Sequence, residues 1–196
     1  MMDYDSLLEF MSLAEKLKCN TRHSWTSSGR HESVAEHCFR LMIFAWLMRE
    51  EFPELDMERV MELCLFHDMG EAVTGDVPCF EKGDQERKKE EAALGLISGK
   101  VPEPYRSRMA GIFREIAEMR TPEAKLLQAL DKMEAVIQHN EADISTWIPL
   151  EYDLQFTYGQ KQADAFAYTR GLRDRVYEDS RIKIEKEGLE KKIDGE

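Results

Sequence analysis

Apolar residues recur at helical spacing along almost all of this 196-residue chain, and this periodicity constrains the fold more than any other feature. The first example has Leu7, Leu8, Met11, Ala14 and Leu17 on one helical face. No run of alternating apolar and polar residues indicates strands. The pattern therefore predicts an all-α fold, a single helical bundle of about six or seven helices.

Several sequence signals predict where helices begin. Ser33 and Glu36 have the S-x-x-E spacing of a capping box before the apolar stretch 34–48. Asp56 is an expected N-cap for a helix that continues through residue 67 and ends at the stretch 75–78. Thr121-Pro122-Glu123 combines an N-cap, a proline at the first position and an acid in the first turn.

Further helices are expected over residues 84–98, 104–119 and about 160–186, whereas the aromatic stretch 143–158 is interpreted as a loop. No segment rich in proline, glycine or serine divides the chain. We therefore expect residues 1–140 to form a core and residues 141–196 a C-terminal extension of the same domain.

The charge distribution excludes some classes of partner and favours another. With 27 Lys and Arg against 39 Asp and Glu, the net charge of −12 opposes general binding to nucleic acid or anionic membranes. Residues 16–31 nevertheless contain four basic residues and no acid. A locally positive segment in an acidic protein is suited to capturing a phosphate monoester.

The cysteines and the apolar stretches bear on location. The four cysteines are widely spaced and form no CxxC pair, which is typical of reduced thiols in a cytosolic protein. The first ten residues lack the basic-then-apolar pattern of a signal peptide, and the longest apolar stretch, Leu41 to Met48, is too short to span a bilayer. We expect a cytoplasmic protein that does not contact membranes.

His67 and Asp68 form the pair with the clearest chemical potential. His67 lies four residues after Leu63 on the apolar face of its expected helix. A buried histidine beside a buried carboxylate is costly unless a partner such as a metal ion binds both. The alternative is a core histidine whose N–H is satisfied by a carbonyl.

Two other helices each offer one group of the same kind. His37 lies four residues before Leu41 on an apolar face, and Asp131 lies four residues after Leu127. Together with His67 and Asp68 they would form the two-His, two-Asp set of a hydrolytic divalent-metal site. Because carboxylates are numerous in this chain, the pattern alone leaves a structural role open.

The ordered set H…HD…D resembles the signature of the HD-domain metal-dependent phosphohydrolases, and most closely that of the bacterial 5′-deoxynucleotidase subfamily. The resemblance rests on residues 30–37, on 67–78 with the pattern H-D-x-x-E-x-x-x-G-D-x-P, and on 121–131. It covers roughly residues 5–140. A bare His-Asp dipeptide is unspecific, whereas the ordered set with this pattern is highly specific.

The resemblance implies that His37, His67, Asp68 and Asp131 bind one divalent ion. Their mixed nitrogen and oxygen donors suit Mn²⁺, Co²⁺, Fe²⁺, Ni²⁺ or Zn²⁺. No histidine lies between Asp68 and Asp131, which favours a site for a single ion. The resemblance also implies a homodimer.

Two acids are the expected catalytic residues. Glu71 is three residues after Asp68, so on a continuous helix it shares that face and reaches a metal-bound water as general acid or base; the alternative is a solvated surface glutamate. Asp76 matches a site residue of the family, and its alternative is a turn residue that bonds its own backbone.

The resemblance also implies residues at the substrate. Arg22 matches a phosphate-binding position, and Arg30 and Glu32 match positions that flank the metal. For both arginines the alternative is a solvated charge in a loop. Glu36 has two interpretations, the capping box or a hydrogen bond to a ligand histidine.

The base and sugar end of the substrate is less well matched. The bacterial relatives have tryptophan directly after the phosphate-binding arginine, whereas this chain has His23 there and Trp25 two residues later. Trp25 is expected to stack on a base or cover the sugar, or else to be structural. Glu118 aligns with a substrate-side carboxylate only across a gap.

The reaction that follows is hydrolysis of a phosphomonoester, most consistently a (deoxy)nucleoside 5′-monophosphate. The alternatives are hydrolysis of another nucleotide or of a non-nucleotide phosphate, a regulatory module that holds metal and nucleotide without turnover, and a structural helical scaffold. A pure binding module would not require an acid or base at Glu71, so that residue favours the enzyme.

Overall fold

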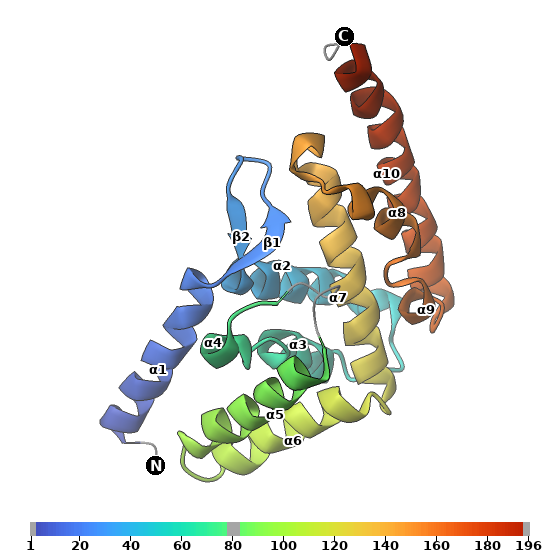
Figure 1. Cartoon of the computed structure of the whole chain (residues 1–196). Helices are drawn as coiled ribbons and strands as arrows, with labels where there is room; N and C mark the ends of the chain where they lie inside the picture. The colour runs from blue at the N-terminus through green and yellow to red at the C-terminus, as the bar shows by residue number, and fades with distance from the viewer. Residues whose placement is uncertain (1–2, 78–82, 194–196) are drawn as a thin grey trace. The chain divides into compact units, whose positions relative to one another are not determined.

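The computed structural model describes residues 3–77 and 83–193, without the side chains of 84, 86, 87 and 188–193, and shows a mostly helical chain (Figure 1). The prediction of an all-α fold is confirmed. The elements are α1 (Tyr4–Cys19), β1 (Thr21–Trp25), β2 (His31–Ser33), α2 (Val34–Leu47), η1 (Arg49–Glu51), α3 (Met57–Phe66), α4 (Glu71–Thr74), α5 (Asp84–Gly99), α6 (Tyr105–Glu118), α7 (Pro122–Glu141), η2 (Ile144–Thr146), α8 (Pro149–Thr157), α9 (Gln160–Ala163) and α10 (Ala167–Ile193).

The chain forms two compact units. The first contains Met1–His23 and Glu32–Ala124, and the second contains Ser24–His31 and Lys125–Glu196. In the first unit α2 packs on α3, α1 contacts α2 and α4, and α5 packs on α4 and α6. Residues from α2 and α3 form its centre and exclude water almost completely: Val34, Leu41, Ala45, Val60, Leu63 and Cys64.

In the second unit α10 packs on η2, α8 and α9. The stretch predicted to be a loop is mainly helical here, so that prediction is wrong. Pro149 occupies the first turn of α8, where its missing N–H costs nothing, and the Glu151 carboxylate accepts a hydrogen bond from the Ile148 N–H at 2.7 Å. Trp147 is buried and donates from Nε1 to the His139 carbonyl at 3.0 Å.

The predicted start signals are confirmed as caps. Ser33 and Glu36 form the reciprocal capping box, with the Ser33 N–H donating to the Glu36 carboxylate at 2.8 Å. Asp56 accepts from the Arg59 N–H at 3.0 Å, and Thr121 Oγ1 accepts from the Ala124 N–H at 3.2 Å. These side chains therefore fix where α2, α3 and α7 begin.

Two local predictions are wrong. The helix expected to continue past residue 67 ends at Phe66, and a tight turn follows in which the Glu71 N–H donates to the Asp68 carbonyl at 3.0 Å. A separate short helix, α4, begins at Glu71. The polar segment before α2 contributes a two-stranded hairpin of β1 and β2, whose turn places Gly29 at φ +81°.

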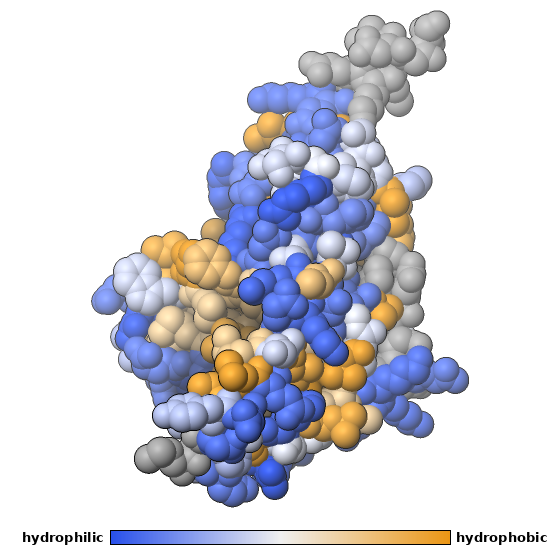
Figure 2. Space-filling view, turned by 90° about the vertical axis from the view of Figure 1, so that its left-hand side faces the viewer, coloured by the Kyte–Doolittle hydropathy of each residue, from blue (hydrophilic) through white to orange (hydrophobic). Residues whose placement is uncertain are grey.

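Several apolar residues of the predicted helices are exposed. Leu8 and Met11 on α1 are 63% and 57% exposed, and Phe39 and Trp46 on α2 are 61% and 57% exposed. Figure 2 looks onto the side of α1 and shows hydrophobic surface among hydrophilic side chains. Among the described residues no helix is long and apolar enough to cross a membrane. Pro78, the last residue of the sequence pattern, and Cys79 lie outside the described residues.

Candidate metal centre

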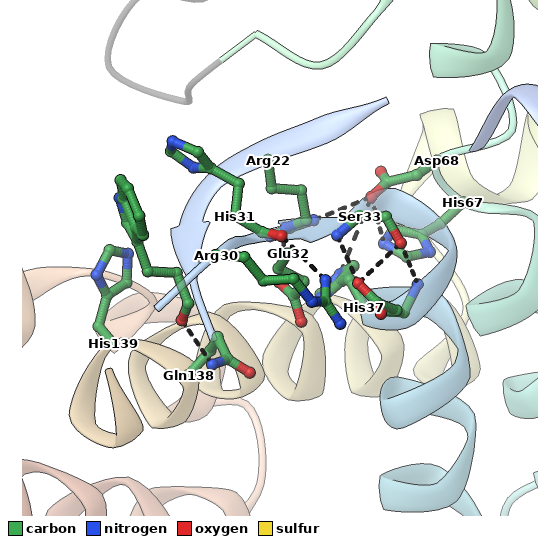
Figure 3. A network of polar contacts seen from close by, with 12 residues as sticks. Arg22, Arg30, His31, Glu32, Ser33, His37, His67, Asp68, Gln138 and His139 are labelled. Carbon is green, nitrogen blue, oxygen red and sulfur yellow. Dashed lines mark hydrogen bonds and ion pairs between the residues drawn. The ribbon is translucent and has the colours of Figure 1, made fainter. Parts of the chain in front are cut away.

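Two histidines and an aspartate of the first unit converge on one point (Figure 3). His37 lies one turn inside α2 and is fully buried, whereas His67 and Asp68 lie in the turn directly after α3. Asp68 Oδ2 is 3.2 Å from His67 Nε2 and 3.9 Å from His37 Nε2. The start of α2 and the end of α3 therefore bring His37 together with two adjacent residues that lie 30 and 31 positions later in the sequence.

The hydrogen bond at Nδ1 of His67 determines whether the other ring nitrogen, Nε2, carries a proton or a lone pair. His67 Nδ1 lies 2.9 Å from the Cys64 carbonyl, which accepts only from an N–H. In the neutral imidazole Nε2 then carries a lone pair and faces a carboxylate oxygen. Two lone pairs in contact require a cation between them, either a proton or a metal ion.

The spacing of these atoms fits a metal ion. Two ligand atoms that each lie about 2.1 Å from an ion are about 3–4 Å apart at ordinary coordination angles. Both distances from Asp68 Oδ2 fall in this interval, and the ligand nitrogens of His37 and His67 lie within 4.8 Å of each other. The residues present are therefore suited in type and spacing to hold a divalent ion.

Asp68 is also held by an arginine. Arg22 donates from NH1 to Asp68 Oδ2 at 3.3 Å, and its Nε lies 3.3 Å from the carboxylate of the buried Glu32. Burial acts to raise the pKa of the Asp68 carboxyl, but the charge and hydrogen bond of His67 and the charges of His37 and Arg22 outweigh it and hold that pKa below its usual range. Asp68 is therefore ionised, the state in which a carboxylate can bind a metal ion.

The two proposed catalytic acids lie just beyond this turn. Glu71 is the first residue of α4 and is 4% exposed, which excludes the solvated surface glutamate considered above. Because the helix breaks at residues 67–70, a tight turn rather than a shared helix face connects Asp68 to Glu71, whose N–H donates to the Asp68 carbonyl. Asp76 follows Gly75, whose φ of +76° turns the chain, and it is partly exposed.

Asp131 belongs to the second unit. It lies on α7, its side chain is 15% exposed, and Lys132 donates to its Oδ2 at 2.9 Å. The same unit contains Trp25 at the end of β1 and Arg30 in the hairpin turn. Arg30 is exposed and donates to the His31 carbonyl at 3.1 Å, while the Trp25 ring lies 4.1 Å from the His31 ring between centroids.

Two of the predicted residues have local partners. Glu36 is exposed and forms the capping box with Ser33, so the capping interpretation accounts for its contacts with that residue. Glu118 ends α6, and its side chain is 44% exposed with Arg120 NH1 at 3.7 Å. The structure records no contact of Glu118 with the residues described around Asp68.

Sequence reasoning missed two residues around these groups, Asn20 and Lys132, whereas it favoured a buried core thiol over a ligand for Cys38. The Cys38 Sγ lies within 4.8 Å of ligand atoms of His67 and Asp68, and burial raises the pKa of its thiol. Asn20 donates from Nδ2 to the Glu71 carbonyl, which fastens the start of α4 to the end of α1. Lys132 pairs with Asp131. Only Lys132 had a sequence signal, its adjacency to a candidate ligand.

Comparison with known proteins connects this geometry to a family. The sequence model described as "HD domain" matches residues 14–169. A human protein named 5′-deoxynucleotidase HDDC2 is 31% identical over 140 residues, which are 69% of this chain and 68% of the relative. The fission yeast 5′-deoxynucleotidase hdd1 is 27% identical over 175 residues, 85% of this chain and 82% of the relative.

Solved structures with the same fold are also similar to this chain. A predicted metal-dependent phosphohydrolase from Magnetospirillum magnetotacticum has a TM-score of 0.69 at 22% identity. The match covers 89% of this chain and 95% of that protein's chain. A conserved hypothetical protein from Pyrococcus furiosus has a TM-score of 0.68 at 26% identity, with 89% and 99% covered.

Proposed function

Because the chain belongs to the HD-domain family of phosphohydrolases, we propose that it removes the phosphate from (deoxy)nucleoside 5′-monophosphates in a metal-dependent hydrolysis. The observation that carries the proposal is the convergence of His37 Nε2 and His67 Nε2 on the ionised Asp68 carboxylate. The names of the human and fission yeast relatives support the class of substrate.

The proposed metal ligands are His37, His67, Asp68 and Asp131. The first three are supported by their spacing, and Asp131 by its match to the family pattern and by its low exposure. One bound Mn²⁺, Co²⁺, Fe²⁺, Ni²⁺ or Zn²⁺ would supply Lewis acidity and lower the pKa of a water molecule. His67 keeps Nε2 available for this role because Nδ1 is engaged with the Cys64 carbonyl.

Glu71 and Asp76 are the proposed proton carriers. Glu71 is buried and directly follows the turn of residues 67–70, called the ligand turn below. Its carboxylate is therefore shielded from bulk water and suited to take a proton from the attacking water. Asp76 lies beyond the Gly75 turn and is partly exposed, which suits a group that returns a proton to the leaving oxygen. General acid–base catalysis of this kind contributes about 10²–10⁴-fold.

Arginine side chains provide the proposed phosphate contacts. Arg22 is oriented by two carboxylates, those of Glu32 and Asp68, so its guanidinium is held at the ligand turn rather than sampling solvent. Arg30 is exposed in the hairpin turn and adds charge for capturing an anion. Glu32 and Glu36 are proposed to act indirectly, through Arg22 and through the start of α2.

Trp25 and Glu118 are the proposed contacts to the base and sugar. The side chain of Trp25 is partly exposed, and Gln138 Nε2 donates to its carbonyl at 2.8 Å, which fixes the backbone at the end of β1 (Figure 3). A fixed aromatic ring is suited to stacking on a base. Glu118 rests only on a gapped match and on its exposed position at the end of α6.

A phosphate-release screen tests the proposal. The full chain is incubated with nucleoside and deoxynucleoside 5′-monophosphates, 3′-monophosphates, nucleoside triphosphates and sugar phosphates, each with Mn²⁺, Co²⁺ or Zn²⁺ and with a chelator. We expect release from 5′-monophosphates that the chelator abolishes. Equal activity with the chelator, or no release from any substrate, would refute it.

Glu71→Gln separates catalysis from binding. The substitution keeps the size of a buried side chain and removes the carboxylate, so we expect kcat to fall about 10²–10⁴-fold with KM nearly unchanged. Glu54→Gln, an exposed site between η1 and α3, is the matched control. An unchanged kcat for Glu71→Gln would remove this residue from the mechanism.

The homodimer and the cytoplasmic location complete the proposal. Phe39, Ile43, Trp46 and Leu47 lie on one face of α2 and are 44–61% exposed, which supports burial against a second copy. Trp46→Glu should then shift the mass measured by light scattering from dimer to monomer. The free thiols of Cys19 and Cys38 support a reducing compartment.

A further inference from the structure

Lys132 lies directly after the candidate ligand Asp131 and contacts it in an unusual way. Neighbouring residues of a helix point about 100° apart and do not normally face each other. The Lys132 Nζ nevertheless lies 2.9 Å from Asp131 Oδ2. A lysine on a helix would ordinarily extend into water, so something holds this one.

The segment between α8 and α9 provides the restraint. Gly159 lies so close to Lys132 that a Cβ added to the glycine would be 2.5 Å from the Lys132 Cβ, and its φ of +73° suits glycine alone. The ring of Tyr158 lies under the ammonium group, with 5.2 Å from Nζ to the ring centroid. The lysine stem and head are therefore confined from two sides.

Tyr158 is itself fixed by its neighbours. Its N–H donates to the Leu154 carbonyl at 2.8 Å, and its carbonyl accepts from the Tyr177 hydroxyl of α10 at 2.7 Å. A connected series of contacts thus runs from α10 through Tyr158 to Lys132 and on to Asp131. An exposed ion pair would contribute little, but both partners here are restrained and mostly covered, with 27% and 15% of their side chains exposed.

We propose that Lys132 is a positioning residue that holds the Asp131 carboxylate in one orientation for a divalent cation, and that Tyr158 and Gly159 of the C-terminal region hold Lys132. The inference rests on the proposed function, because it takes Asp131 as a ligand. The proposal gives the stretch 147–158, through Tyr158, and the following Gly159 a role in orienting Asp131.

The sign of the effect on metal affinity distinguishes positioning from simple charge. An ammonium group near a cation repels it, so removing that charge should tighten metal binding if charge is all that matters. Removing a group that orients a ligand instead weakens binding, typically 10–100-fold. The two explanations predict opposite changes for Lys132→Met.

The experiment measures Mn²⁺ and Co²⁺ binding to the chelator-stripped full chain by calorimetry, with the Co²⁺ absorption spectrum as a second readout. We expect Lys132→Met to weaken binding 10–100-fold and to change the Co²⁺ bands, and Lys132→Arg to retain more affinity. Lys125→Met, an exposed site on the same helix with the same change of charge, should bind as the unaltered chain does.

Affinity of Lys132→Met equal to or tighter than that of the unaltered chain, while Asp131→Asn binds more weakly, overturns the inference and leaves the proposed function intact. If Asp131→Asn also binds normally, the proposed ligand set itself is wrong. Should circular dichroism show that Lys132→Met does not fold, Tyr158→Leu takes its place. That variant keeps the lysine but removes the ring below it, and unchanged metal affinity there overturns the inference.

Discussion

Adding a divalent ion should raise the melting temperature of the chain, and replacing a ligand should abolish most of that rise. His37 lies on α2 while His67 and Asp68 follow α3, so an ion bound by all three ties the start of one helix to the end of another. The unfolded chain does not hold these groups together. Binding therefore stabilises the folded state alone.

The size of the shift follows from mass action. With the ion at 100 times its dissociation constant, the folded state gains about 2.7 kcal/mol. A chain of 196 residues changes its melting temperature by about 2–4 °C for each kcal/mol, so the expected rise is about 5–11 °C. If loss of one ligand weakens binding a hundredfold, the gain at the same concentration falls to about 0.4 kcal/mol, or about 1–2 °C.

Differential scanning calorimetry of the chelator-stripped chain with added Mn²⁺, Co²⁺ or Zn²⁺ measures the shift. His37→Gln and Asp68→Asn are the ligand variants, and Glu54→Gln is the exposed control. The control should show the full rise. Equal shifts in all four proteins would mean that the ions bind elsewhere, and the reasoning about the three ligands would be refuted.

Three further predictions concern stability and are checked by urea denaturation. Ser33→Ala removes the Oγ acceptor of the α2 cap and should cost about 1 kcal/mol; no loss would mean that the Glu36 half of the box suffices. Glu115→Gln weakens a carboxylate that accepts from Arg59 Nε at 2.9 Å and NH2 at 2.7 Å, with an expected cost of about 1–2 kcal/mol, and a gain in stability would contradict it. Leu41→Ala leaves a cavity at a fully buried site of α2 and should cost about 2–5 kcal/mol, whereas under 1 kcal/mol would contradict the packing.

The helix starts were predictable because their signals are local. A capping side chain and the N–H that it satisfies are three residues apart, so Ser33, Asp56 and Thr121 carry their information within one turn. The HD signature was recognisable for a related reason, since it is an ordered set of residue types. The sequence thus predicted the fold class and the family.

The break after α3 could not be read from periodicity. His67, Glu71 and their neighbours satisfy a helical spacing, yet the backbone forms a turn that presents two consecutive residues, His67 and Asp68, around one point. A continuous helix would separate these neighbours by about 100°. The break therefore depends on tertiary structure and not on local sequence, because the turn has to place these two residues beside His37.

Other differences have similar causes. The hairpin of β1 and β2 has strands of five and three residues, too short for alternation to be distinguished from a polar loop. In α8 the aromatic residues masked a helix that Pro149 and Glu151 begin. The exposure of Trp46 shows that an apolar helix gives no indication of which of its faces will lack a partner within the chain.

The central claim is that His37, His67 and Asp68 bind one metal ion, and anomalous diffraction from crystals soaked in Mn²⁺ or Co²⁺ tests it most directly. The account predicts one strong anomalous peak about 2.0–2.3 Å from His37 Nε2, His67 Nε2 and the Asp68 carboxylate. A map without a peak at these three atoms, with the imidazoles and the carboxylate bridged only by a proton, would contradict it.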